Sequence, residues 1–194
     1  MAKPVLLFTV GFLQEKCLQA IFRSLIDDQQ IELNCHSTED SAAITAGAFV
    51  SRRPDRYAAV VLETSSEEAE KIRETYETGC WRVASFYPSR DQWHVALAIP
   101  SVQKWVLIDD HIRQEYEKIR QDPGMASTPE ERAKIDQSNF YTLATKIGDW
   151  VAVQPFDLEA LKQRSRQVRE LCMFIEKSLQ PKPKAEPVTA ENWF

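Results

Sequence analysis

The chain has 194 residues, of which 43% are hydrophobic and 27% are charged, and its formal net charge at pH 7 is -5. Such values are typical of one globular domain with a packed core, and they exclude a largely disordered chain. The negative charge opposes attraction to phosphate backbones, and no apolar run is long enough to span a bilayer. Neither nucleic acid nor a membrane is therefore an expected partner.

Two strands and a helix are predicted in the first part of the chain. Residues 5–10 form a continuous apolar stretch, which is typical of a strand covered on both faces. Gly11 permits a tight turn, and apolar residues then recur at helical spacing over residues 12–26. Residues 31–35 predict a short second strand.

Capping residues mark the next helices. Thr38 supplies a capping oxygen for a segment of mixed helix and loop character over residues 41–51. A third strand, again continuously apolar, is predicted over residues 57–62. Ser65 lies three residues before a glutamate, which is a capping box that opens a helix, and Gly79 is expected to end that helix.

The alternation of strands and helices is weaker in the middle of the chain. Residues 81–87 and 93–99 are strand-like and close enough for a hairpin or for successive edge strands. A further short strand is predicted over residues 106–108. Asp110 is expected to cap a helix that ends near Gln121.

The last elements complete one domain. Thr128 begins a predicted helix, because proline and glutamate follow it in the first turn. Residues 150–153 predict a last strand, and residues 157–179 predict a long helix with one apolar stripe. The sequence thus predicts a single α/β domain over residues 1–180, followed by a disordered, Pro-rich tail over residues 181–194.

Helices that alternate with continuous apolar strands predict an α/β fold of three layers. We expect a mostly parallel sheet with helices on both faces, either flavodoxin-like or class I glutamine amidotransferase-like. Ligands of such folds bind outside the carboxyl ends of the strands. The predicted ligand-binding residues therefore follow the strands, and they are Gly11, Phe12, Glu63, Thr64 and Tyr87.

Metal and nucleotide motifs are missing from the sequence. The four cysteines, Cys17, Cys35, Cys80 and Cys172, form no Cys-x-x-Cys pair, so no zinc site is expected. Reduced, mostly structural thiols are typical of a cytoplasmic protein. The turn after the first strand has neither a Gly-x-Gly-x-x-Gly nor a phosphate-loop motif, so no cofactor is expected.

Three side chains are candidates for catalysis, namely Cys80, His94 and Glu63. Cys80 precedes a predicted strand, whereas a nucleophile elbow places its nucleophile after one. His94 has no metal-ligating neighbour at the right spacing. Glu63 holds the place where receiver domains carry their phospho-accepting aspartate, although the acidic pair after the first strand is absent. The sequence offers no trio of nucleophile, base and oxyanion site.

Basic residues gather on the last predicted helix. They are Lys162, Arg164, Arg166 and Arg169, interleaved with glutamine and serine. A solvated helix face is the first interpretation of this cluster, and partner docking is the second.

Residues 5–88 resemble the ThuA-like branch of the class I glutamine amidotransferase-like fold. The matching residues are the opening strand with Gly11 and Phe12, the run from Thr38 to Ala43 with Thr45, and residues 57–61. The resemblance implies this fold and a sugar-related activity. The triad of a cysteine elbow, a histidine and a glutamate is not present, so amidotransferase activity is not expected.

The first functional prediction is a non-classical α/β domain that binds a protein or a small ligand. Two alternatives stay open. One is a small-molecule enzyme, sugar-related by the resemblance, with its site at the carboxyl ends of the strands. The other is a pseudo-receiver-like signalling domain in which Glu63 is a permanent anion. The sequence leaves open whether the chain forms a homo-oligomer.

Overall fold

The structure is a computed structural model that describes residues 3–51, 53, 55–83, 90–108, 110–121 and 148–180. The helix predicted from Thr128, the tail over residues 181–194 and Tyr87 lie outside the described residues. Within the described part, no helix is both long and apolar enough to cross a membrane.

Four parallel strands form the described sheet, in the order β2-β1-β3-β4. They are β1 (Val5–Val10), β2 (Ile31–His36), β3 (Ala58–Glu63) and β4 (Trp93–Ala98). Leu7 of β1 is level with Leu33 of β2 on one side and with Ala59 of β3 on the other. The two continuous apolar stretches are thus adjacent central strands, as the sequence predicts. The order is that of the first four strands of a flavodoxin-like sheet.

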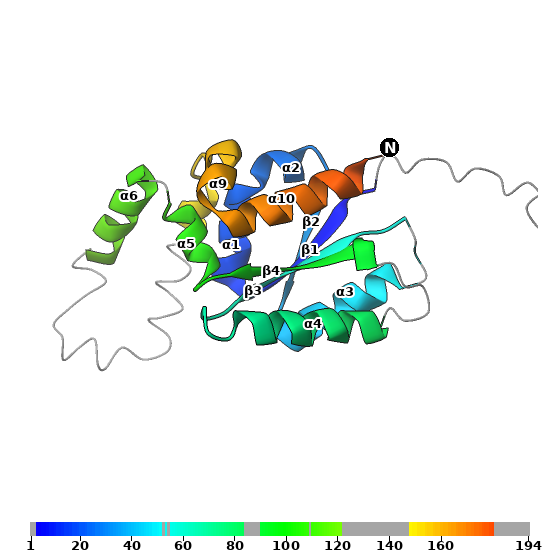
Figure 1. Cartoon of the computed structure of the whole chain (residues 1–194). Helices are drawn as coiled ribbons and strands as arrows, with labels where there is room; N and C mark the ends of the chain where they lie inside the picture. Colours follow the sequence, from blue (N-terminus) through cyan, green and yellow to red (C-terminus); the bar gives the residue numbers. More distant parts are fainter. Residues whose placement is uncertain are drawn as a thin grey trace, which may run out of the picture.

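Helices cover both faces of the sheet, which confirms the predicted three-layer α/β fold (Figure 1). One face carries α3 (Glu39–Val50) and α4 (Ala69–Val83). The other face carries α1 (Phe12–Ile21), α2 (Arg23–Asp27), α9 (Leu158–Arg164) and α10 (Arg166–Leu179). The connections β1–β2 and β2–β3 run in opposite directions across the sheet, so right-handed crossovers place α1 and α3 on opposite faces.

Alternate side chains of each strand supply two separate cores. Leu7 and Val61 belong to the core under α1 and α10, whereas Phe8 and Val60 belong to the core under α3 and α4. All four are at most 2% exposed. Because neighbouring residues of a strand point to opposite faces, burial on both faces requires a continuous apolar sequence.

Side-chain oxygens fix where several helices begin. Thr38 accepts a hydrogen bond from a backbone N–H three residues later, as expected for the cap of α3. Asp157 and Ser165 cap α9 and α10 in the same way. The helix predicted over residues 157–179 is therefore two helices, because the extended backbone of Ser165 separates them. The helix predicted over residues 12–26 is likewise divided, at Phe22.

The fourth helix is longer than the sequence predicts. α4 runs through Gly79 to Val83, so Gly79 does not end it, and residues 81–83 are helical rather than the start of a strand. Ile72 and Tyr76 of this helix pack on the core under α3 and α4. Tertiary packing of the helix outweighs the β propensity of a short apolar run, and the strand prediction is wrong for these residues.

The described residues that follow β4 form helices and the turns between them. α5 (Val102–Val106) takes in the start of the strand predicted over residues 106–108, and that prediction is wrong. α6 (Asp110–Gln121) matches the predicted helix. Residues 148–152 are helical where the sequence predicts a strand over residues 150–153. A short apolar run has the same composition in a buried strand and in a buried helical turn, so periodicity could not separate them.

The substitution Leu7→Ala should lower the free energy of unfolding by about 2–4 kcal/mol, because the fully buried side chain leaves a cavity under α1. Ile44→Ala, on the exposed face of α3, is the control and should change stability by less than about 0.5 kcal/mol. Equilibrium unfolding in urea measures both variants. Equal losses for the two would contradict the central position of β1.

Candidate functional site

The first turn after β1 is closed by a buried amide. The Gln14 side-chain oxygen accepts hydrogen bonds from the Val10 backbone N–H (2.8 Å) and from the Thr9 hydroxyl. The Gly11 N–H donates to the His36 carbonyl at the end of β2 (3.1 Å). Gly11 has a φ of +81°, which favours glycine, and the space beside it is open. This turn therefore joins β1, α1 and β2.

Glu63 and Thr64 join β3 to its neighbours. The Glu63 carboxylate accepts a hydrogen bond from the Val102 backbone N–H, 2.8 Å away at the start of α5. The N–H of the buried Thr64 donates to the Ala98 carbonyl at the end of β4 (3.1 Å). Because the first N–H groups of a helix have no acceptor within that helix, Glu63 stabilises and positions α5.

Phe12 is in contact with its own helix and with a distant segment. The Lys16 ammonium lies 5.2 Å from the centroid of the Phe12 ring. A Cβ atom added to Gly148 would lie 3.0 Å from the same ring, so the 148–152 helix approaches α1 closely here. Phe12 is 42% exposed, yet it lines neither of the two large cavities described below.

His94 and Glu63 do not share one site. His94 is level with Ala59 near the amino end of β4, whereas Glu63 is level with Ala98 at the carboxyl end. At about 3.3 Å per residue, four positions along the sheet separate them by roughly 13 Å. Cys80, the third candidate for catalysis, belongs to α4, and its side chain lies outside the described residues.

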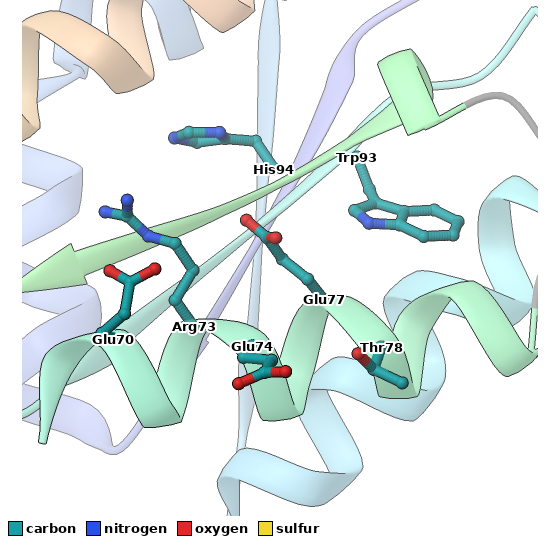
Figure 2. Close-up of a pocket in the computed structure, with 7 residues that line it drawn as sticks. All are labelled: Glu70, Arg73, Glu74, Glu77, Thr78, Trp93 and His94. Atoms are coloured by element: carbon teal, nitrogen blue, oxygen red, sulfur yellow. The ribbon is translucent and has the colours of Figure 1, made fainter.

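His94 lines a cavity of about 590 Å³ between α4 and β4, which we call the α4–β4 cavity (Figure 2). The other lining residues are Glu70, Arg73, Glu74, Glu77, Thr78 and Trp93. The His94 ring stacks on Phe174 of α10, with 5.3 Å between ring centroids. Burial, together with the Arg73 charge, lowers the pKa of His94, so the imidazole is mainly neutral at pH 7.

The described thiols are protonated at neutral pH. Burial and the Glu63 charge raise the pKa of Cys17 to about 12, and burial raises the pKa of Cys172 to about 12. Partial burial and then Glu15 also raise the pKa of the exposed Cys35. A raised pKa reduces the thiolate fraction, so these thiols are weak nucleophiles. Among the described residues, no cluster of His, Cys, Asp or Glu side chains could hold a metal ion.

A second cavity, of about 570 Å³, opens at the carboxyl end of β4. We call it the carboxyl-end cleft. Ile99 and Pro100 line it directly after β4, together with the buried Trp105 of α5. Its other lining residues are Lys104, Leu107, Ile108, Arg113, Glu117, Arg164, Ser165 and Gln167. The cleft has the size of a small-molecule site and lies at the edge where α/β sheets bind ligands.

Three cationic side chains and one carboxylate line this cleft. No carboxylate of the described residues pairs with Lys104 or Arg164. Arg164 donates one hydrogen bond to the Ile108 carbonyl (3.1 Å), which leaves its other N–H donors for a ligand. Arg113 pairs with Asp110 (2.5 Å) at the exposed surface, where solvent weakens such a pair. The cleft is therefore positive on a negatively charged chain.

The amino end of α10 lies at the same cleft. Ser165 and Gln167 line the cleft, and the Ser165 hydroxyl accepts a hydrogen bond from the Val168 N–H (3.3 Å). The first N–H groups of a helix carry partial positive charge and need acceptors. This helix end and the cationic side chains favour an anion, while Ile99 and Trp105 offer apolar surface. The cleft thus suits an anion that has an apolar part.

The sequence does not predict this site. Arg164 is predicted to lie on a solvated helix face, with partner docking as the second interpretation, and no pattern singles out Lys104 or Arg113. The rule that ligands bind after the strands, applied to β4, points to Ile99 and Pro100. No local pattern, however, shows that the break at Ser165 brings α9 and α10 to this edge.

Comparisons with known proteins support the fold. No protein-family model matches the chain, and no curated protein matches it significantly. A similar solved structure is the C-terminal region of the OLD protein of Xanthomonas campestris pv. campestris, with a TM-score of 0.57 and 11% sequence identity. The match covers 91% of this chain and 96% of that chain. At this identity the likeness shows the fold alone, and the resemblance to the ThuA-like family stays a prediction.

Cys17 and Cys172 should react with iodoacetamide far more slowly than Cys35 in the folded protein. Their raised pKa leaves little thiolate at neutral pH, and burial excludes the reagent. Mass spectrometry of the labelled peptides over time gives each rate, and urea-unfolded protein, in which the three rates should converge, is the control. Rapid labelling of Cys17 in the folded chain would show that this thiol is activated.

Proposed function

We propose that this chain is a binding module whose ligand is a small organic anion held in the carboxyl-end cleft. One observation carries the proposal. Lys104 and Arg164 converge on the cleft without an ionic partner among the described residues, at the ligand-binding edge of the fold. Cationic side chains that line one cleft attract an anion into it.

The charged and the apolar side chains of the cleft make different contacts with the ligand. The Arg164 guanidinium is a planar donor that matches a carboxylate or a phosphate, and Lys104 adds a point charge. The partial positive charge at the start of α10 adds attraction for the anion. Trp105 and Pro100 contact the apolar part of the ligand. Charge therefore provides attraction, and the apolar wall provides selectivity.

The described residues favour binding over catalysis. Glu63 already accepts a hydrogen bond from the start of α5, and His94 lies at the other end of β4. Acyl or phosphoryl chemistry needs a nucleophile and a base within reach of one substrate atom. Of the three predicted catalytic candidates, these contacts leave Cys80 open, and rapid alkylation of Cys80 at neutral pH would favour the enzyme alternative.

Phenyl phosphate, a small anion with an apolar ring, should bind to the intact chain and should bind roughly tenfold more weakly to the Arg164→Gln variant, because a charge-assisted hydrogen bond is lost. Isothermal titration calorimetry measures both affinities. Arg169→Gln is the matched control, because it removes the same charge from an exposed position of α10 that does not line the cleft. Thermal melting verifies that both variants fold.

Two results would contradict the proposed site. One is equal weakening by Arg164→Gln and Arg169→Gln, which would indicate general electrostatic attraction. The other is equally tight binding of benzyl alcohol, which has the ring without the anion. Binding of phenyl phosphate should also weaken as salt is added, since exposed charges are screened.

A further inference from the structure

The α4–β4 cavity is separate from the carboxyl-end cleft, since the two share no lining residue. It lies beside β4, the last strand in the described sheet order. Figure 2 shows Glu70, Arg73 and Glu77 extending from α4 toward β4. In the same view, His94 and Trp93 lie on opposite faces of that strand.

Arg73 has an unsatisfied donor in this cavity. Its side-chain Nε atom is buried and has no hydrogen-bond partner. Every other buried side-chain nitrogen or oxygen of the described residues has one. A buried N–H without an acceptor is costly, and native proteins supply a partner for nearly all of them. Nε and a terminal nitrogen of a guanidinium form a fork that matches a carboxylate. The unsatisfied Nε–H of Arg73 therefore indicates a carboxylate ligand, because no described residue accepts this hydrogen bond.

The three carboxylates that line the cavity beside Arg73 are exposed. Glu70, Glu74 and Glu77 form no ion pair with a described residue. The lining thus has three carboxylates against one guanidinium, and the half-buried His94 adds little charge because its pKa is lowered. A simple anion would be repelled, and a simple cation would leave the Arg73 donor unsatisfied. A ligand with one carboxylate for Arg73 and more than one cationic group for the glutamates fits this lining.

We propose that the α4–β4 cavity binds a free basic amino acid of the lysine type. Its carboxylate accepts the hydrogen bond from the Arg73 Nε–H. Its two ammonium groups donate to Glu70 and Glu77, which lie about one helical turn before and after Arg73 on α4. This arrangement satisfies the buried donor and reduces the excess of carboxylates over cationic groups in the lining.

L-lysine at millimolar concentration should shift the Nε–Hε resonance of Arg73 in nitrogen-15 spectra of the full chain. The Arg73→Lys variant identifies that resonance by its loss. This variant keeps the positive charge but has no planar donor fork, so its affinity for L-lysine should fall roughly tenfold, as measured from the backbone resonances of β4. Unchanged dispersion of the spectrum verifies that the variant folds.

Two matched ligands test the charges separately. Cadaverine is lysine without its carboxylate, and L-norleucine lacks the side-chain ammonium, so both should bind more weakly than L-lysine. Cadaverine binding as tightly as L-lysine would overturn the proposal, because the cavity would then be a general acidic surface. The absence of any shift with L-lysine would overturn it as well.

A cleft variant separates this inference from the proposed function. Arg164→Gln lies outside the α4–β4 cavity and should bind L-lysine with unchanged affinity. Conversely, Arg73→Lys should bind phenyl phosphate as the unmodified chain does. Loss of L-lysine binding in Arg164→Gln would contradict a second, independent site.

Discussion

Burial of β1 and β3 on both faces is the constraint on which the rest of the structure depends. Leu7 and Phe8 are neighbours in sequence, yet they belong to different cores, so helices must cover both faces of the sheet. Right-handed crossovers then decide which helix covers which face. Because all four strands are parallel, their carboxyl ends meet at one edge, and every connection that starts there begins close to the others.

That edge is held together mainly by polar groups that bind one another. Gln14 closes the turn after β1, and Glu63 caps α5. The hydrogen bonds of these two side chains join strands to helices. The ligand site that we propose at this edge lies instead beside β4. There α5, positioned by Glu63, contributes Lys104 and Trp105 to the carboxyl-end cleft.

The two large cavities have opposite charges although both adjoin β4. The carboxyl-end cleft has more cationic than acidic side chains, and the α4–β4 cavity has more acidic than cationic ones. Among the described residues, Lys104 and Arg164 of the first have no carboxylate partner, and the Arg73 Nε of the second has no hydrogen-bond partner. The ligands that we propose for the two cavities therefore differ in charge, an anion for the first and a basic amino acid for the second.

The sequence by itself determined the parts of the fold that depend on neighbouring residues. The continuous apolar runs identified β1 and β3, and Thr38 marked the start of α3. Tertiary structure alone decided that residues 81–83 are helical and that Ser165 separates two helices. It also decided that Arg164 donates a hydrogen bond to the Ile108 carbonyl. Apolar periodicity is a local property that any strand or helix needs for burial. Convergence of charged side chains depends on contacts between residues far apart in sequence, and no local pattern encodes those contacts.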